Sequence, residues 1–276
     1  MFDTPAKHAR EHIARAKVAL GKADIQKSVI SLIEALKMMS SGKIFGREKF
    51  EVEVHLQECL KEFNRHPDIK KFFTSQNVHK TPYVSYQRGQ EKQVLQFMLK
   101  TLGEMRAGQK KSEEEARGRK EQRKKDMLDK GQQLLNAKEF PKAKSMMRKV
   151  AEAYGNEPGV LTDIGGRLLK AGLFFEAGEF LEEAIAKNPK DSHAFAFAIQ
   201  AYKNAREFEK MEKLYKAALK QFGAHPRTLQ NMAKMYLDWR KYDKAYDFAK
   251  QAYDGDNSLL DAKEIMDTCG KRIFSR

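Results

Sequence analysis

VLTDIGGRLLKAGLFFEAGEFLEEAIAKNP, residues 160–189, makes up most of one sequence unit that occurs four times between Lys124 and Asn257. The clearest repeated column is aromatic: Phe140, Phe174, Phe208 and Tyr242 follow one another at steps of 34 residues. The other columns with this step are Met127, Leu161, Phe195 and Leu229; Leu134, Leu168, Tyr202 and Tyr236; and Val150, Ala184, Ala218 and Ala252. A repeat of this length predicts helix–turn–helix units that stack into a solenoid.

Each half of a unit has helical spacing. In the second unit, Leu161, Ile164, Gly165 and Leu168 follow at i, i+3, i+4 and i+7, which places them on one helix face. Ala177, Leu181, Ala184 and Ile185 repeat the pattern after a turn at Gly172. Small residues recur at matched positions, which predicts that the two helices of a unit pack closely. In the first helices these residues are Gly131, Gly165 and Ala233, and in the second helices they are Ala143, Ala177 and Ala245.

These residues resemble the tetratricopeptide repeat (TPR) family. The family's pattern of a large apolar residue, Leu-Gly, an aromatic, Ala, an aromatic and Pro is matched by Leu161, Ile164-Gly165, Leu168, Ala177, Leu181 and Pro189. The third unit departs from it, with Ile199 in place of Gly and Met211 in place of Ala. The resemblance covers about half the chain. It implies an all-α solenoid of four units, 124–157, 158–191, 192–225 and 226–257.

The end of a solenoid exposes an apolar face, which usually needs a cap. Asn257-Ser258 can begin a helix, and Ala262, Met266, Cys269 and Ile273 then form an apolar stripe at helical steps. Residues 258–274 are therefore predicted to be a capping helix, so the solenoid region runs over 124–276.

Residues 1–107 predict a separate N-terminal helical domain. Helices are expected at about 6–21, 24–39, 47–64 and 90–106, with a short amphipathic turn near Ile69, Phe72 and Phe73. Residues 74–89 lack a helical period and predict an ordered loop. Residues 108–123 are charged, with no apolar residue larger than alanine. They predict a linker, which is either flexible or an exposed helix held by Glu–Lys and Glu–Arg pairs.

The formal net charge is +15, and it is uneven. Residues 1–125 hold 27 Lys and Arg against 16 Asp and Glu, whereas residues 126–276 hold 26 against 22. This excess favours acidic partners, nucleic acid or an anionic membrane surface without choosing among them. No apolar run reaches the roughly 18 residues of a membrane span, and the first residues lack the apolar core of a signal peptide. Cys59 and Cys269 lie beside apolar residues, which is typical of two buried thiols in a reducing compartment. A cytoplasmic protein is expected.

Catalytic motifs are missing from the sequence. It contains no Gly-rich phosphate loop, Ser-centred elbow or paired CxxC. His8 with His12, and His55 with Cys59, lie at i, i+4, but neither pair has the third ligand that a metal site needs. We therefore expect no enzyme activity, no cofactor and no metal.

In the TPR family the first helix of each unit lines a concave groove that receives an extended peptide. The resemblance implies these groove residues: Gln132, Asn136, Lys170, Phe197, Gln200, Asn204, Arg227, Asn231 and Lys234, with Asp129 and Asp163 in matching slots. Amides can pair with a peptide backbone, and Phe197 can hold an apolar side chain. The acidic Asp129 and Asp163 argue against the family's clamp for the acidic tails of chaperones.

The sequence thus predicts a non-enzymatic scaffold or adaptor that binds a peptide or partner protein in the TPR groove, with its oligomeric state open. The alternative is an adaptor for nucleic acid or another polyanion. Its candidate residues are Lys80, Arg88, Arg117, Arg119, Lys120, Arg123, Lys124 and Lys125. In the loop, Lys80 and Arg88 alternate with Tyr83 and Tyr86, which can either stack on bases or anchor the loop to the helices beneath it.

Overall fold

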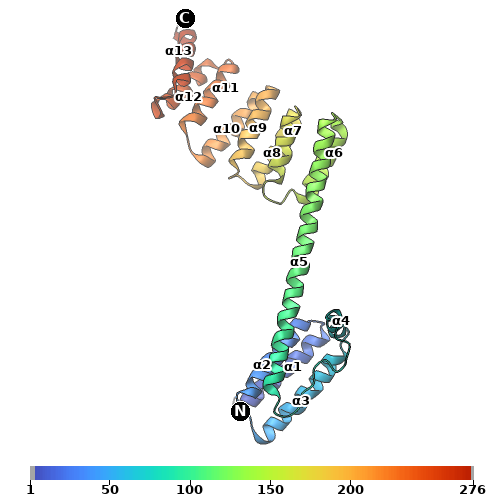
Figure 1. The fold of residues 1–276 in the computed structure, drawn as a ribbon. Helices are drawn as coiled ribbons and strands as arrows, with labels where there is room; N and C mark the ends of the chain where they lie inside the picture. Colours follow the sequence, from blue (N-terminus) through green and yellow to red (C-terminus); the bar gives the residue numbers. More distant parts are fainter. Residues whose placement is uncertain (1–3, 275–276) are drawn as a thin grey trace. The chain divides into compact units, whose positions relative to one another are not determined.

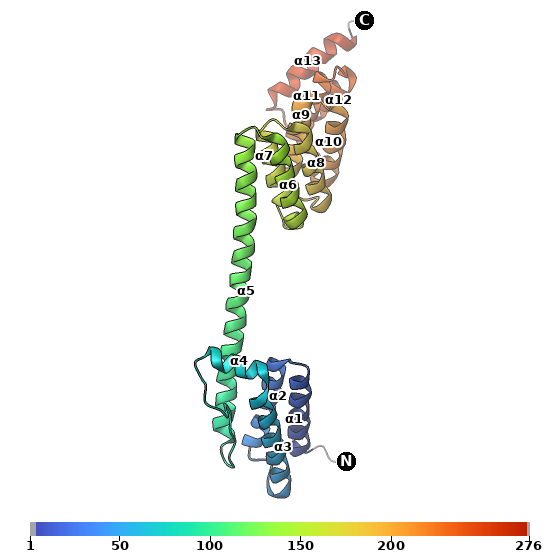
Figure 2. The ribbon, with the colours of Figure 1, turned by 90° about the vertical axis from the view of Figure 1, so that its right-hand side faces the viewer.

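The computed structural model describes residues 4–274, which form thirteen helices and no strand (Figures 1 and 2). The all-α prediction is therefore confirmed. The chain divides into two compact units, Met1–Gly118 and Arg119–Arg276, which we call unit 1 and unit 2. Helix α5, Glu91–Asn136, contributes residues to the cores of both.

Unit 1 is built from α1 (Pro5–Gly21), α2 (Ile25–Ser40), α3 (Gly46–Arg65), α4 (Pro67–Ser75) and the first part of α5. The first two helices begin where side chains cap them, because Thr4 Oγ1 accepts from Lys7 N at 3.3 Å and Asp24 Oδ1 from Lys27 N at 3.1 Å. The predicted bounds of α1, α2 and α3 are right to within one residue at each end.

Helix α4 corrects the prediction of a short turn. Pro67 occupies its first position, and the His66 side chain accepts a hydrogen bond from Asp68 N at 3.2 Å. Ile69 and Phe73, four residues apart, are both buried in the core of unit 1. A proline start, a side-chain cap and one apolar face are sufficient for a short helix that packs on its neighbours.

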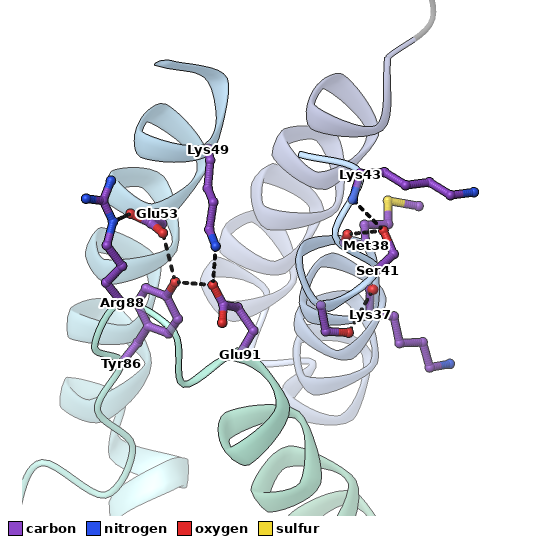
Figure 3. Close-up of polar contacts among 10 residues, drawn as sticks. Lys37, Met38, Ser41, Lys43, Lys49, Glu53, Tyr86, Arg88 and Glu91 are labelled. Atoms are coloured by element: carbon purple, nitrogen blue, oxygen red, sulfur yellow. Dashed lines mark hydrogen bonds and ion pairs between the residues drawn. The ribbon is translucent and has the colours of Figure 1, made fainter. Parts of the chain in front are cut away.

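The loop after α4 is anchored by a buried polar network (Figure 3). The Tyr86 hydroxyl donates to Glu53 at 3.2 Å or to Glu91 at 3.1 Å. Lys49 Nζ lies 2.9 Å from Glu91 Oε1, and Arg88 Nε donates to Glu53 Oε2 at 3.2 Å. Glu53 and Glu91 are 5% and 7% exposed, so both carboxylates depend on these partners. Burial opposes the ionisation of Glu91, but its backbone N–H, Lys49 and Tyr86 outweigh burial and hold its pKa below the usual value.

Helix α5 corrects the prediction of a helix that ends near residue 106. It continues through the charged segment, where every side chain from Arg106 to Arg123 is exposed. Pairs at i, i+4 line this stretch, such as Gln109 with Glu113 at 2.9 Å and Lys110 with Glu114 at 3.9 Å. Of the two alternatives for residues 108–123, the exposed helix held by local pairs is the one observed. Their assignment as a linker stays a prediction.

Unit 2 repeats a helix pair at the step expected from the sequence. After the end of α5 come α6 (Phe140–Tyr154), α7 (Val160–Lys170), α8 (Phe174–Lys187), α9 (Ser192–Ala205), α10 (Phe208–Phe222), α11 (Pro226–Asp238), α12 (Tyr242–Gly255) and α13 (Leu260–Phe274). The four residues of the aromatic column are the first residues of α6, α8, α10 and α12, so each marks the start of a second helix. Unit 2 is thus a TPR-type solenoid.

Close helix approach explains the small residues in the repeats. A Cβ added to Gly131 would lie 2.7 Å from Met147 Cε, and one added to Gly165 would overlap Leu181. The six predicted small positions are all buried. A contact of the same kind was not foreseen from the sequence: a Cβ on Gly178 would lie 2.5 Å from Tyr202 Cζ. Helices in this solenoid therefore touch at a distance that a larger side chain forbids.

The capping helix α13 begins at Leu260, two residues later than predicted. Ser258 is held in a preceding turn, because Asp256 Oδ1 accepts from its backbone N at 3.0 Å and from its hydroxyl at 2.6 Å. The predicted stripe is correct: Ala262 and Cys269 are fully buried, and Met266 and Ile273 are half-buried. Burial also raises the pKa of the Cys269 thiol.

An aromatic stack joins the third and fourth repeats. Trp239 lies between Phe208 and Tyr236, with ring centroids 5.7 and 6.1 Å apart, and Tyr236 stacks on Phe248 at 5.4 Å. Beside this stack, Glu212 lies 2.6 Å from Lys216 Nζ and 3.4 Å from Lys244 Nζ. The hydrogen bond from Lys216 is the main cause that lowers the pKa of Glu212 to about 2.

Replacing Glu212 by glutamine is expected to remove an acid-sensitive part of the stability of unit 2. The Glu212 pKa falls from 4.5 in the unfolded chain to about 2 on folding, so its contribution is complete above pH 4.5 and is lost as the pH falls towards 2. Thermal unfolding should show wild type losing more stability than Glu212→Gln across this range. Glu209→Gln, at an exposed position of the same helix α10 and without an ion pair among residues 4–274, is the control. Parallel losses for wild type and Glu212→Gln would contradict the assignment.

Candidate interaction surface

The predicted groove residues lie on the end of α5 and on α7, α9 and α11. We call this surface the first-helix face and define it by the nine residues predicted above. Gln132 and Phe197 are half-buried, and the other seven are exposed. Lys170, Gln200 and Asn204 have no side-chain hydrogen bond or ion pair within the described chain, so their polar groups are available to a partner.

A hydrogen-bonded row crosses the first two repeats on this face. Arg167 Nε donates to Asp163 Oδ2 at 2.9 Å, and its Nη1 donates to Gln132 Oε1 at 3.4 Å. Gln132 Nε2 in turn donates to Asn136 Oδ1 at 2.9 Å. Three predicted residues are thereby joined through Arg167, which the sequence analysis did not single out. Its i, i+4 spacing from Asp163 was the available signal.

Phe197 has a role in repeat packing. A Cβ added to Gly166 on α7 would lie 3.3 Å from Phe197 Cε2, so the ring packs over a residue without a side chain. Gly166 is itself buried. The ring is therefore partly committed to the contact between the second and third repeats, which limits its predicted use as an anchor for a ligand.

An apolar hollow of about 490 Å³ lies between α9, α10 and α11. Its lining consists of Ser192, Phe195, Ala196, Ile199, Tyr215, Ala218, Phe222, His225, Thr228 and Asn231. Phe195 and Phe222 meet edge to face with centroids 5.5 Å apart, which fixes one wall. Of the predicted groove residues, Asn231 lines the hollow. The other lining residues were not predictable from the sequence as a binding site, because they come from three helices and because Ile199 stands where the family pattern has Gly.

Two predicted cations of the fourth repeat act on neighbouring acids. Lys234 Nζ lies 2.6 Å from Asp261 Oδ2 on α13, which joins α11 to the cap. Arg227 helps to lower the pKa of Asp256, after the larger effect of the Ser258 hydrogen bonds. Both basic side chains remain exposed, but part of their charge is already balanced.

Some of the residues predicted to bind a polyanion are paired with carboxylates of this chain, and others are exposed. Lys120 and Lys124 each lie 2.7 Å from a Glu157 oxygen, and their hydrogen bonds lower the pKa of that carboxyl group. Arg88 is bound to Glu53, and Tyr86 is buried, so this part of the loop serves unit 1 internally. The remaining predicted cations are exposed: Lys80, Arg117, Arg119, Arg123 and Lys125.

Within residues 4–274, no three His, Cys, Asp or Glu side chains gather as a metal site would require. The helices in that range are also too short or too polar to cross a bilayer.

Comparisons with known proteins give structural likenesses alone. No family model matches the chain, and no curated protein matches it. A crystal structure of MamA protein is 16% identical, with a TM-score of 0.43 over 54% of this chain and 81% of that chain. MamA residues 41 to the end from Desulfovibrio magneticus RS-1 are 20% identical, with a TM-score of 0.38 over 49% and 77%. A tetratricopeptide repeat protein from Parabacteroides merdae ATCC 43184 is 12% identical, with a TM-score of 0.34 over 95% and 99%. The assignment of unit 2 to the TPR type rests on its helix pairs and their repeated contacts.

Proposed function

We propose that this TPR-type protein is a non-enzymatic scaffold or adaptor that binds an extended segment of a partner protein on the first-helix face of unit 2. The proposal rests on the hollow between α9, α10 and α11, which Asn231 lines, and on the exposed amide and basic side chains that α9 and α11 also carry. An apolar recess beside a few polar groups is the usual composition of a binding site.

Two regions of the surface would make different kinds of contact with the partner. The hollow would take a large apolar side chain of the partner, because its wall includes Phe195, Ile199 and Phe222. Gln200 and Asn204 on α9 would pair with the partner's backbone, since their amides have no partner within residues 4–274. Arg227 and Lys234 would favour acidic residues beside the anchor.

Filling the hollow tests this proposal without emptying the core. Ala196 is exposed at the edge of the hollow, so Ala196→Trp should block it. Ala217→Trp places the same side chain at an exposed position of α10 outside the lining and is the matched control. Peptides selected from an unconstrained library against the full chain should carry a large apolar anchor. Ala196→Trp should weaken their binding about tenfold or more, and Ala217→Trp by about twofold or less.

Salt dependence separates this mode of binding from charge neutralisation. Backbone pairing and an apolar anchor give a shallow decrease of affinity with salt, whereas phosphate contacts give a steep one. Equal binding of the selected peptides by wild type and Ala196→Trp would remove the hollow from the proposed site. A steep salt dependence together with insensitivity to Ala196→Trp would contradict the groove proposal as a whole.

A further inference from the structure

A second hollow, in unit 1, is lined by uncompensated positive charge. Its volume is about 500 Å³, and its lining is Lys61, Asn64, Arg65, Lys70, Thr81, Pro82 and Tyr83. Lys61 and Arg65 lie one turn apart on α3, Lys70 comes from α4, and the other wall is the loop that follows α4. The lining contains three cations and no carboxylate.

The charges of this hollow are free in a way that those of Lys120 and Lys124 on α5 are not. Lys61, Arg65 and Lys70 are exposed and have no ion-pair partner within the described chain. The acids nearest to them in sequence have other neighbours: Glu58 and Glu62 lie 3.3 and 3.5 Å from Lys17 Nζ, and Asp68 lies 3.8 Å from His66 Nδ1. By contrast, Lys120 and Lys124 share Glu157. Between residues 61 and 88 there are six Lys and Arg against two Asp and Glu.

The loop that forms the other wall of this hollow is held in place by contacts to α3 and α4. Asn64 Nδ2 donates to Val84 O at 2.8 Å, and Asn64 Oδ1 accepts from Val84 N at 3.0 Å, so the loop is fixed to α3. The Tyr83 ring stacks on buried Phe73 with centroids 4.6 Å apart and planes 9° apart. Tyr83 is half-buried and lines the hollow, so a fixed aromatic ring borders the three cations.

We propose that this hollow binds single-stranded nucleic acid, with Lys61, Arg65 and Lys70 on the phosphates and Tyr83 beneath an unpaired base. Cations along a groove combined with an aromatic platform are the chemistry by which proteins hold single strands. The stacked bases of a duplex present no free face to Tyr83, and phosphoserine, phosphothreonine or a phospholipid headgroup has no aromatic ring to stack on it. The site lies outside the first-helix face and does not depend on the peptide-binding proposal.

The test uses the full chain and a fluorescein-labelled oligothymidylate of about 15 nucleotides, followed by anisotropy. The triple variant Lys61→Gln, Arg65→Gln, Lys70→Gln should weaken binding about tenfold or more. It should also reduce the slope of log K against log salt by about 2, from three contacts at roughly 0.7 each. The control Arg117→Gln, Arg123→Gln, Lys125→Gln removes the same charge from exposed positions of α5 and should change binding by about twofold or less.

Two further measurements test the role of the Tyr83 ring and the integrity of the fold. Tyr83→Leu should weaken oligothymidylate binding but leave binding of heparin, a polyanion without bases, unchanged. Thermal unfolding of each variant verifies that the fold is intact. Equal losses in the two triple variants would mean that binding follows net charge, and the proposal would be wrong. Failure of wild type to bind the oligonucleotide would overturn it too, as would binding only to a phosphopeptide or to anionic vesicles.

Discussion

Replacing Leu168 by alanine is expected to lower the free energy of unfolding of unit 2 by about 2–5 kcal/mol. Leu168 on α7 is fully buried, and it belongs to the repeated column that also supplies the buried Tyr202 and Tyr236. Its removal leaves a cavity among the second and third repeats. Because each repeat is stabilised mainly by its neighbours, the loss should reach the adjacent helices as well.

The two cysteines provide separate reporters for this measurement. Cys269 is buried in unit 2 and Cys59 in unit 1, so the rate at which a thiol reagent modifies each one under native conditions reports opening of that unit. Leu168→Ala should accelerate modification of Cys269 and leave that of Cys59 nearly unchanged. Leu260→Ala deletes the same atoms at a position that is 70% exposed and should change stability by no more than about 0.5 kcal/mol. A similarly small effect of Leu168→Ala would contradict the repeat packing.

The double variant Lys49→Met, Tyr86→Phe is expected to destabilise unit 1 by roughly 3 kcal/mol. It removes both side-chain donors to Glu91, the lysine at 2.9 Å and the hydroxyl at 3.1 Å, and leaves a buried carboxylate with its backbone N–H. Modification of Cys59 should then become faster. Adding Glu91→Gln removes the unpaired charge and should restore part of the loss.

The control for this network is an exposed pair on the same helix. Lys100 lies 3.8 Å from Glu104, with side chains that are 76% and 39% exposed, so Lys100→Met should cost at most about 1 kcal/mol. If the double variant behaves like Lys100→Met, the buried network does not hold the loop on unit 1. Faster modification of Cys269 but not of Cys59 would place the effect in the wrong unit.

The repeat could be predicted from the sequence because the residues that pack its helices together recur at the same positions of each unit. Phe174 and Phe208 stand at the same place in successive units, and each begins a second helix. Gly165 is needed because Leu181 occupies the space beside it. Because this local spacing is repeated four times, the helix boundaries of a unit that departs from the pattern can be inferred from the other units. The capping stripe with Cys269 was predictable for the same reason, since helical spacing alone defines it.

Features that depend on several helices were not predictable in this way. The hollow beside Asn231 has walls from α9, α10 and α11. The place of Ile199 in its lining therefore follows only from the packing of these three helices. The Lys61, Arg65 and Lys70 cluster likewise needs α3 and α4 to be placed. The sequence does not decide whether α5 continues beyond residue 106, because an exposed charged helix buries no apolar surface that would distinguish it from a flexible segment.

Hydrogen exchange of the full chain, measured with and without a library-selected peptide, identifies the helices that bind the peptide. We expect slower exchange in α9 and α11 around the hollow, extending to α7, with little change in unit 1. Ala196→Trp should abolish this protection at the same peptide concentration, and Ala217→Trp should preserve it. Protection confined to residues 4–118, or to α8, α10 and α12 alone, would contradict binding on the first-helix face.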